Sequence, residues 1–87
     1  MARIFSIDFI YDNASHRAMV AVRQTAFYTE YKISLQSDEL KEILLSDKIV
    51  SPGPGIFVFA NISVQDYNEL MKQILTAVTD HLQFVRH

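Results

Sequence analysis

The stretch Ser63–Leu82, SVQDYNELMKQILTAVTDHL, decides the fold. Its apolar residues recur at spacings of three and four, which places them along one side of a helix. These residues are Val64, Tyr67, Leu70, Met71, Ile74, Leu75, Val78 and Leu82. Ser63 is a good N-cap, and Asp66 completes a capping-box-like pair with it. A helix of this length spans about 30 Å, the width of a small domain, so the preceding chain must supply an apolar surface for it.

Three segments in the first part of the chain alternate apolar and polar residues, as half-buried β-strands do. They cover residues 3–11, 16–23 and 27–35. Residues 12–15 have the composition of a tight turn, which makes the first two segments a hairpin. Residues 24–26 form a weaker break that we interpret as a turn, although a bulge in a continuing strand would also fit the pattern.

The next part of the chain changes period. Ser37 can cap a short helix that we expect to end near Leu45. Residues 49–50 form a brief extended piece, residues 51–55 must be a loop because they hold two prolines, and a fourth strand is expected over 56–61. The sequence thus predicts an α+β fold in the order β-β-β-α-β-α. It is a mainly antiparallel four-stranded sheet with the long C-terminal helix packed on one face.

Length and composition narrow the class of protein. With 87 residues, the chain is expected to form a single domain over residues 1–87. The absence of cysteine excludes disulfides, thiolate metal sites and cysteine nucleophiles. We find no signal peptide and no apolar run that could span a membrane, so we expect a cytoplasmic protein. The net charge of −2 and the scattered basic residues argue against nucleic-acid binding.

No motif predicts a catalytic residue, a cofactor or a metal ligand. His16, His81 and His87 lack the spacing of metal ligands, and the loop 51–55 loses backbone donors to its prolines. Asp8 lies mid-strand among apolar neighbours, so either burial raises its pKa or it faces water on the outer side of the sheet. A small enzyme built around Asp8 or His16 is therefore only the third hypothesis, and we predict a protein without enzymatic activity.

The face of the sheet opposite the long helix is the candidate functional surface. Apolar and aromatic residues are interleaved there with charges of both signs, as in a protein interface. We predict a small interaction module or assembly subunit that contacts a protein partner, in first place a second copy in a homodimer, through this face or a sheet edge. The candidate interface residues are Ile10, Met19, Arg23, Tyr28, Lys32 and Phe57.

Two alternatives remain for this face. In one, the short helix over residues 37–45 folds over it and completes a sandwich, which would leave no interface there. In the other, the chain is a nucleic-acid-associated protein that uses the same face, because aromatic rings beside Arg and Lys can imitate a stacking platform. The residues that would form this platform are Arg23, Tyr28, Lys32 and Phe57.

Overall fold

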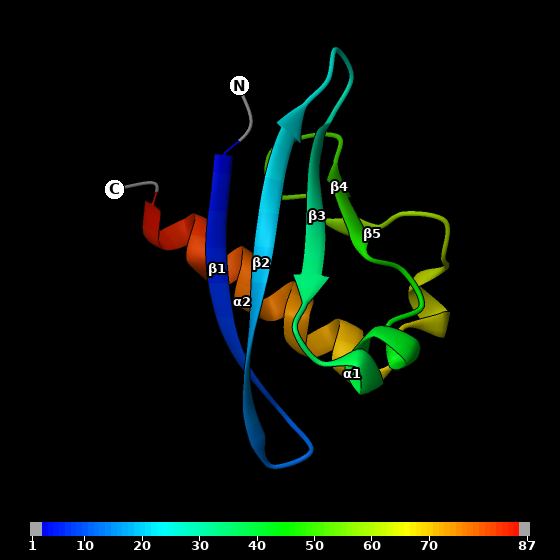
Figure 1. Ribbon diagram of the computed structural model, residues 1–87. Helices are drawn as coiled ribbons and strands as arrows, with labels where there is room; N and C mark the ends of the chain where they lie inside the picture. The colour runs from blue at the N-terminus through cyan, green and yellow to red at the C-terminus, as the bar shows by residue number, and fades with distance from the viewer. Residues whose placement is uncertain (1–2, 86–87) are drawn as a thin grey trace.

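The computed structural model describes residues 3–85, with side chains as far as residue 82. One antiparallel sheet holds five strands in the order β1-β2-β3-β4-β5 (Figure 1). The strands are β1 (Arg3–Tyr11), β2 (Ala14–Gln24), β3 (Thr29–Leu35), β4 (Lys48–Ser51) and β5 (Val58–Phe59). Helix α1 (Asp38–Ile43) follows β3, the 3₁₀ helix η1 (Val64–Asp66) follows β5, and helix α2 (Glu69–Val85) comes last. No helix of the described chain is long and apolar enough to cross a membrane.

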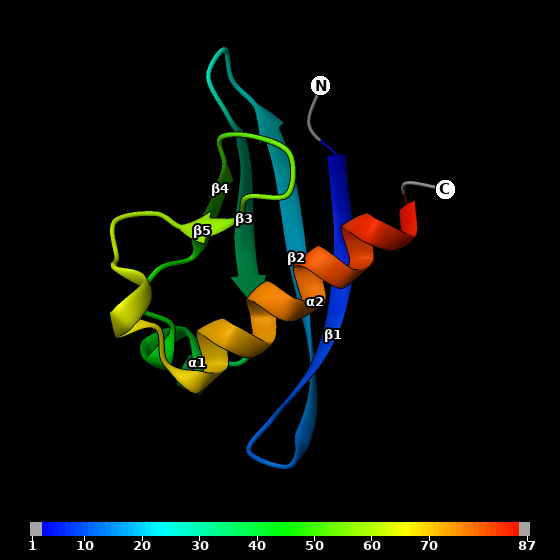
Figure 2. The ribbon, with the colours of Figure 1, turned by 180° about the vertical axis from the view of Figure 1, so that it is seen from behind.

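Helix α2 crosses one face of the sheet diagonally, and no described element covers the other face (Figures 1 and 2). We call the helix-covered face the inner face and the opposite one the outer face. Leu70, Met71, Ile74 and Val78 of α2 are completely buried against alternate residues of the strands. Those inner-face residues include Ile7, Phe9, Ala18, Val20, Val22, Tyr31, Ile33, Leu35, Ile49 and Phe59. The predicted α+β fold with a C-terminal helix on one face is therefore confirmed.

The prediction of four strands was wrong, because the brief extended piece is a strand in its own right. Ile49 of β4 pairs with Tyr31 of β3 and with Phe59 of β5, and its side chain is completely buried. The element order is accordingly β-β-β-α-β-β-α, with β5 limited to residues 58–59. A strand of four residues shows too little alternation to be distinguished from a loop by its pattern.

The long helix begins at Glu69 rather than after Ser63. Asn68 caps it, because its Oδ1 accepts the Met71 N–H at 2.9 Å. The Ser63 side chain makes no capping hydrogen bond, and Val64, predicted on the buried stripe, is exposed. The Asn68 Nδ2 also donates to the Ile43 carbonyl at 2.9 Å. One side chain thus starts α2 and ties it to the end of α1.

Both hairpins of the first three strands have tight turns. Asp12 and Asn13 have φ values of 53° and 61°, as a type I′ turn requires. In the second turn, the Thr25 Oγ1 accepts the N–H groups of Phe27 at 3.2 Å and Tyr28 at 3.1 Å. The predicted turn after β2 is therefore confirmed in place of a bulge, but it includes Phe27, which we had assigned to the third strand.

Helix α1 closes one end of the core. Its Leu40 is buried in the same core as the α2 side chains, and Ser37 caps it as predicted, accepting the Leu40 N–H at 3.4 Å. The hydrogen bond from Asn68 to Ile43 holds α1 beside the start of α2. The alternative in which the short helix covers the outer face is therefore wrong.

Candidate protein-interaction surface

The outer face exposes three large apolar side chains on β1 and β2. Ile4 is 65% exposed, Ile10 is 64% exposed and Met19 is 41% exposed. Small residues lie opposite two of them, since Ile4 faces Ala21 and Met19 faces Ser6 in the register. In the monomer these large apolar side chains remain in contact with water. A partner that covered them would remove this contact, so the surface favours association.

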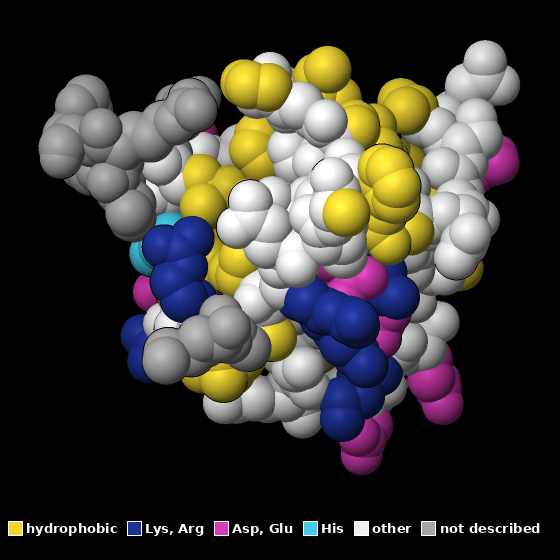
Figure 3. All heavy atoms as spheres, turned by 90° about the horizontal axis from the view of Figure 1, so that it is seen from above, with side chains coloured by type: hydrophobic (Ala, Val, Ile, Leu, Met, Phe, Trp, Pro, Cys, Tyr) yellow, Lys and Arg dark blue, Asp and Glu magenta, His cyan; other side chains and the backbone are white. Residues whose placement is uncertain are grey.

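Two ion pairs lie on the outer face. The Arg17 Nε donates to the Asp8 Oδ1 at 2.9 Å, and the Lys48 Nζ lies 3.3 Å from the Glu30 Oε1. Arg23 lies opposite Glu30 in the register. Seen from the end of the sheet, Lys and Arg side chains gather in one patch with acidic side chains at its borders (Figure 3). The strands of this face carry four cations, Arg17, Arg23, Lys32 and Lys48, against the two carboxylates of Asp8 and Glu30. This excess of two positive charges is small beside the basic faces of nucleic-acid binders.

The structure divides the six candidate interface residues between two places. The outer face carries Ile10, Met19, Arg23 and Lys32. Tyr28 lies in the turn between β2 and β3. Phe57 is half-buried on the side of Phe59, and its ring centre is 6.0 Å from that of Tyr31. These two residues thus lie apart from the other four, because Tyr28 is outside the strand and Phe57 has the inward parity of Phe59.

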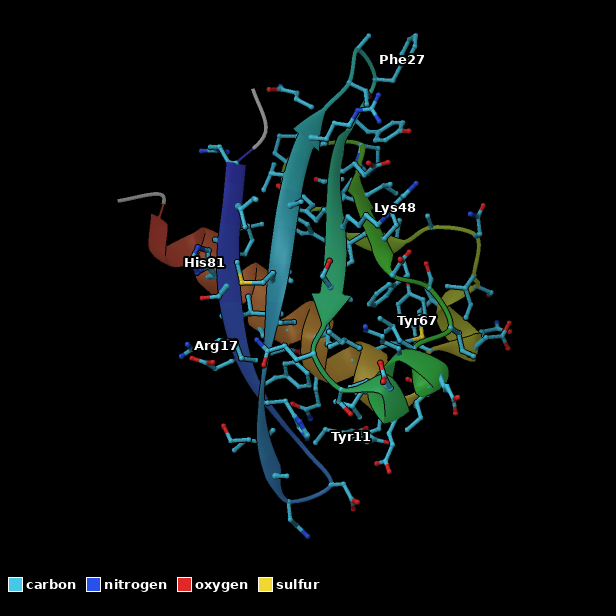
Figure 4. All side chains as sticks on the ribbon, in the orientation of Figure 1. Tyr11, Arg17, Phe27, Lys48, Tyr67 and His81 are labelled. Carbon is cyan, nitrogen blue, oxygen red and sulfur yellow. The ribbon has the colours of Figure 1, made fainter. Side chains whose placement is uncertain are left out.

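Tyr28 and Phe57 line a separate surface at the end of the sheet, which we call the aromatic groove. It has a volume of about 630 Å³ and lies between the β2–β3 turn, the loop 51–55 and the α2 residues Thr79 and Leu82. Phe27 stands at its rim, 86% exposed, and projects beyond the strands (Figure 4). The predicted loop 51–55 is thus one wall of the groove.

The sequence analysis missed the exposure of Phe27. The alternation over residues 27–35 includes this residue in the third strand, whereas the structure places it in the turn before β3. The signal that could have corrected this is Thr25, whose hydroxyl accepts backbone N–H groups two and three residues ahead. Such local bonds compete with the strand ladder and favour a turn.

Strand β1 presents a free edge that is nine residues long. It is first in the strand order and pairs with β2 over its whole length, without a bulge. Because a type I′ turn is closed by a hydrogen-bonded pair, here Tyr11 and Ala14, the odd residues of β1 bond to β2. The backbone N–H and C=O groups that point away from the sheet belong to Ile4, Ser6, Asp8 and Ile10. This edge holds no proline or lysine, two of the residues that protect edge strands from pairing.

Asp8 and His16 lie on opposite faces of the sheet. Asp8 is exposed on the outer face, and its hydrogen bond from Arg17 lowers the pKa of its carboxyl. His16 lies half-buried toward the inner side, with its ring centre 5.6 Å from that of Phe9. It borders a depression of about 290 Å³ that no Asp or Glu of the described chain lines.

His81 is engaged in a ring contact on the inner face. His81 of α2 stacks on Phe5 of β1, with ring centres 4.1 Å apart and an interplanar angle of 3° (Figure 4). His87 lies outside the described residues. Within residues 3–85, no three His, Asp or Glu side chains gather closely enough to hold a metal ion.

Known proteins provide no assignment for this chain. No family model, curated protein or solved structure matches it. The functional argument therefore depends on the geometry of two surfaces: the outer face with its β1 edge, and the aromatic groove.

Proposed function

We propose that this protein is a small non-enzymatic interaction module that associates with a protein partner, in first place with a second copy of itself, through the outer face and the β1 edge. The observation that carries the proposal is the exposure of Ile4 (65%) and Ile10 (64%) on a face that no described element covers. Full burial of such a side chain stabilises a protein or complex by about 1.5–3 kcal/mol. In the monomer, Ile4 and Ile10 realise little of this stabilisation because they stay exposed.

The chemistry of the outer face suits a protein partner. Apolar side chains lie beside charge pairs, so a partner could bury the apolar side chains while each charge pair stays bonded within its own chain. The charge pairs of Asp8 with Arg17 and of Glu30 with Lys48 are already formed within one chain. Association with a protein would therefore leave Arg17 and Lys48 bonded to their carboxylates. The phosphates of a nucleic acid would have to compete with the same carboxylates for these cations.

Light scattering across a dilution series tests the proposal. We expect a mass of twice the 10.0 kDa chain at high concentration, falling toward the single chain on dilution. Met19→Glu should shift this equilibrium toward the monomer, because it places an unpaired carboxylate in the apolar part of the contact.

Tyr28→Glu is the matched control, since this residue lines the aromatic groove and is also partly exposed. It should leave the association unchanged. A single-chain mass at every concentration would contradict self-association. A dimer that neither Met19→Glu nor Tyr28→Glu weakens would show that neither the outer face around Met19 nor the aromatic groove is the contact.

A further inference from the structure

We infer that β1 pairs antiparallel with β1 of a second copy in a register centred on Ile7, so that Ile4 of each chain lies opposite Ile10 of the other. The inference rests on the proposed function and deepens it by naming the partner and the contact. The backbone groups that would bond are those of Ile4, Ser6, Asp8 and Ile10, which point away from the sheet. The result is one continuous sheet through both copies.

Symmetry favours the antiparallel arrangement. A two-fold axis perpendicular to the sheet makes the edge strands antiparallel and keeps both α2 helices on the same side. Parallel edge strands would need an axis within the sheet plane, which would place the second helix on the opposite side. Only the antiparallel dimer therefore continues the apolar inner face from one copy to the other.

The sequence of β1 distinguishes the possible registers. Only even-numbered residues have outward-pointing backbone groups, so even residues must pair with even residues. The register centred on Ile7 overlaps all nine residues of the strand. A register centred on Ser6 sets Ile4 opposite Asp8. One centred on Asp8 sets this carboxylate opposite its own copy, and like charges directly opposite each other are destabilising.

The register centred on Ile7 gives complementary neighbours on the outer face. Ile4 meets Ile10 at both ends of the contact, so the two exposed large apolar side chains of the strand cover each other. In the middle, the Ser6 hydroxyl lies opposite Asp8 and can donate to its carboxylate. Arg17 of the same chain stays in place on the other side of Asp8, at 2.9 Å.

The inner face is complementary in the same register. Phe5 lies opposite Phe9 of the second copy, and Ile7 lies opposite itself. The C-terminal end of α2 extends past β1 in both views, on the inner side (Figures 1 and 2). Since His81 of α2 stacks on Phe5, this end of the helix would reach beneath the strand of the second copy near its Phe9. The overhang would then help to cover the joined sheet.

Disulfide trapping tests the register, because the chain has no cysteine of its own. The chain carrying both Ile4→Cys and Ile10→Cys should form a covalent dimer in mildly oxidising buffer, seen on a non-reducing gel and reversed by reductant. Opposite Cα atoms in a hydrogen-bonded pair are about 5.5 Å apart, within the range of about 4.4–6.8 Å that a disulfide spans. Both positions are exposed in the monomer, so the double variant should keep its fold. Circular dichroism checks this.

The single variants provide the controls. Neither Ile4→Cys nor Ile10→Cys alone should form a covalent dimer. In this register, the same residue in the two copies is offset by about 20 Å along the antiparallel strands. An equimolar mixture of the two single variants should crosslink. Efficient crosslinking of Ile4→Cys alone, of Ser6→Cys alone or of Asp8→Cys alone would instead indicate a parallel contact or one of the shifted registers, and would overturn the inference.

The experiment separates the inference from the proposed function. If the wild-type chain is a dimer by light scattering but the double variant does not crosslink, the β1 register is wrong and self-association through another surface stands. If the wild-type chain has the mass of one chain at every concentration, both the register and the self-association are wrong.

Discussion

Val20 and Met19 are neighbours in β2, yet Val20 is completely buried on the inner face and Met19 is 41% exposed on the outer face. The same contrast runs along β1, where Ile7 is buried and Ile4 and Ile10 are exposed. All five are apolar, so hydrophobicity does not distinguish the two faces. The position of α2 does, because it covers one face and leaves the other open. Residues under the helix hold the fold together, and residues opposite it are available for association.

The largest effect should come from a charge beneath the helix. Ile74→Asp removes a completely buried side chain, which costs about 2–5 kcal/mol, and buries a carboxylate without a partner, which costs several more. Small proteins have a total stability of about 5–15 kcal/mol, so we expect unfolding, seen as loss of the cooperative thermal transition in circular dichroism. Thr76→Asp on the exposed side of the same helix should fold normally. A folded Ile74→Asp variant would show that α2 does not dock as described.

A cavity on the inner face should cost more than the same kind of truncation on the outer face. Ile49→Ala should lower the free energy of unfolding by about 2–5 kcal/mol, because Ile49 is completely buried. Ile10→Ala should change it by less than about 0.5 kcal/mol in solution dilute enough to keep the chain monomeric. Urea denaturation measures both values. Equal losses would contradict the distinction between the faces.

Substitutions at the start of α2 should change the free energy of unfolding by an intermediate amount. Asn68→Ala removes both the cap of α2 and the donor to the Ile43 carbonyl, so we expect a loss of about 1–2 kcal/mol of stability. Ser63→Ala should be close to neutral, since the Ser63 side chain makes no capping bond. The same urea measurement applies. A larger loss for Ser63→Ala would support the helix start that the sequence pattern indicated.

The smallest effect concerns the Asp8 carboxyl on the outer face. The hydrogen bond from Arg17 lowers the pKa of Asp8, so folding favours the ionised form. The resulting stabilisation is present above the ordinary range of an aspartate and is lost as the pH falls through the lowered pKa. Because both side chains are exposed, the stability change should be slight. An NMR titration should show the Asp8 midpoint rising in Arg17→Gln; an unchanged midpoint would mean that the pair does not form in solution.

The sequence was sufficient to predict the elements with long periodic patterns. The first hairpin, the core face of β1 and the buried stripe of α2 from Leu70 onward follow from alternation and helical spacing. The pattern was insufficient to predict elements that are short, or element boundaries that are set by one local hydrogen bond. β4 is too brief to show a period, Thr25 turns the chain before Phe27, and Asn68 competes with Ser63 for the helix start.

The candidate surface could be predicted only in part. Alternation placed Ile10, Met19, Arg23 and Lys32 together, because strand parity holds wherever a strand is uninterrupted. It could not place Tyr28 and Phe57, since each lies outside the strands. Nor could it identify β1 as the edge strand, because the order of strands in a sheet depends on pairing between distant segments.

Amide hydrogen exchange along β1 tests the central claim most directly. The amides of Ile4, Ser6, Asp8 and Ile10 should exchange slowly in concentrated solution and rapidly on dilution, because only the second copy protects them. The alternate amides of β1 should stay protected at both concentrations through their bonds to β2. If the four outward amides exchange rapidly at concentrations where light scattering shows a dimer, the β1 edge is not the contact.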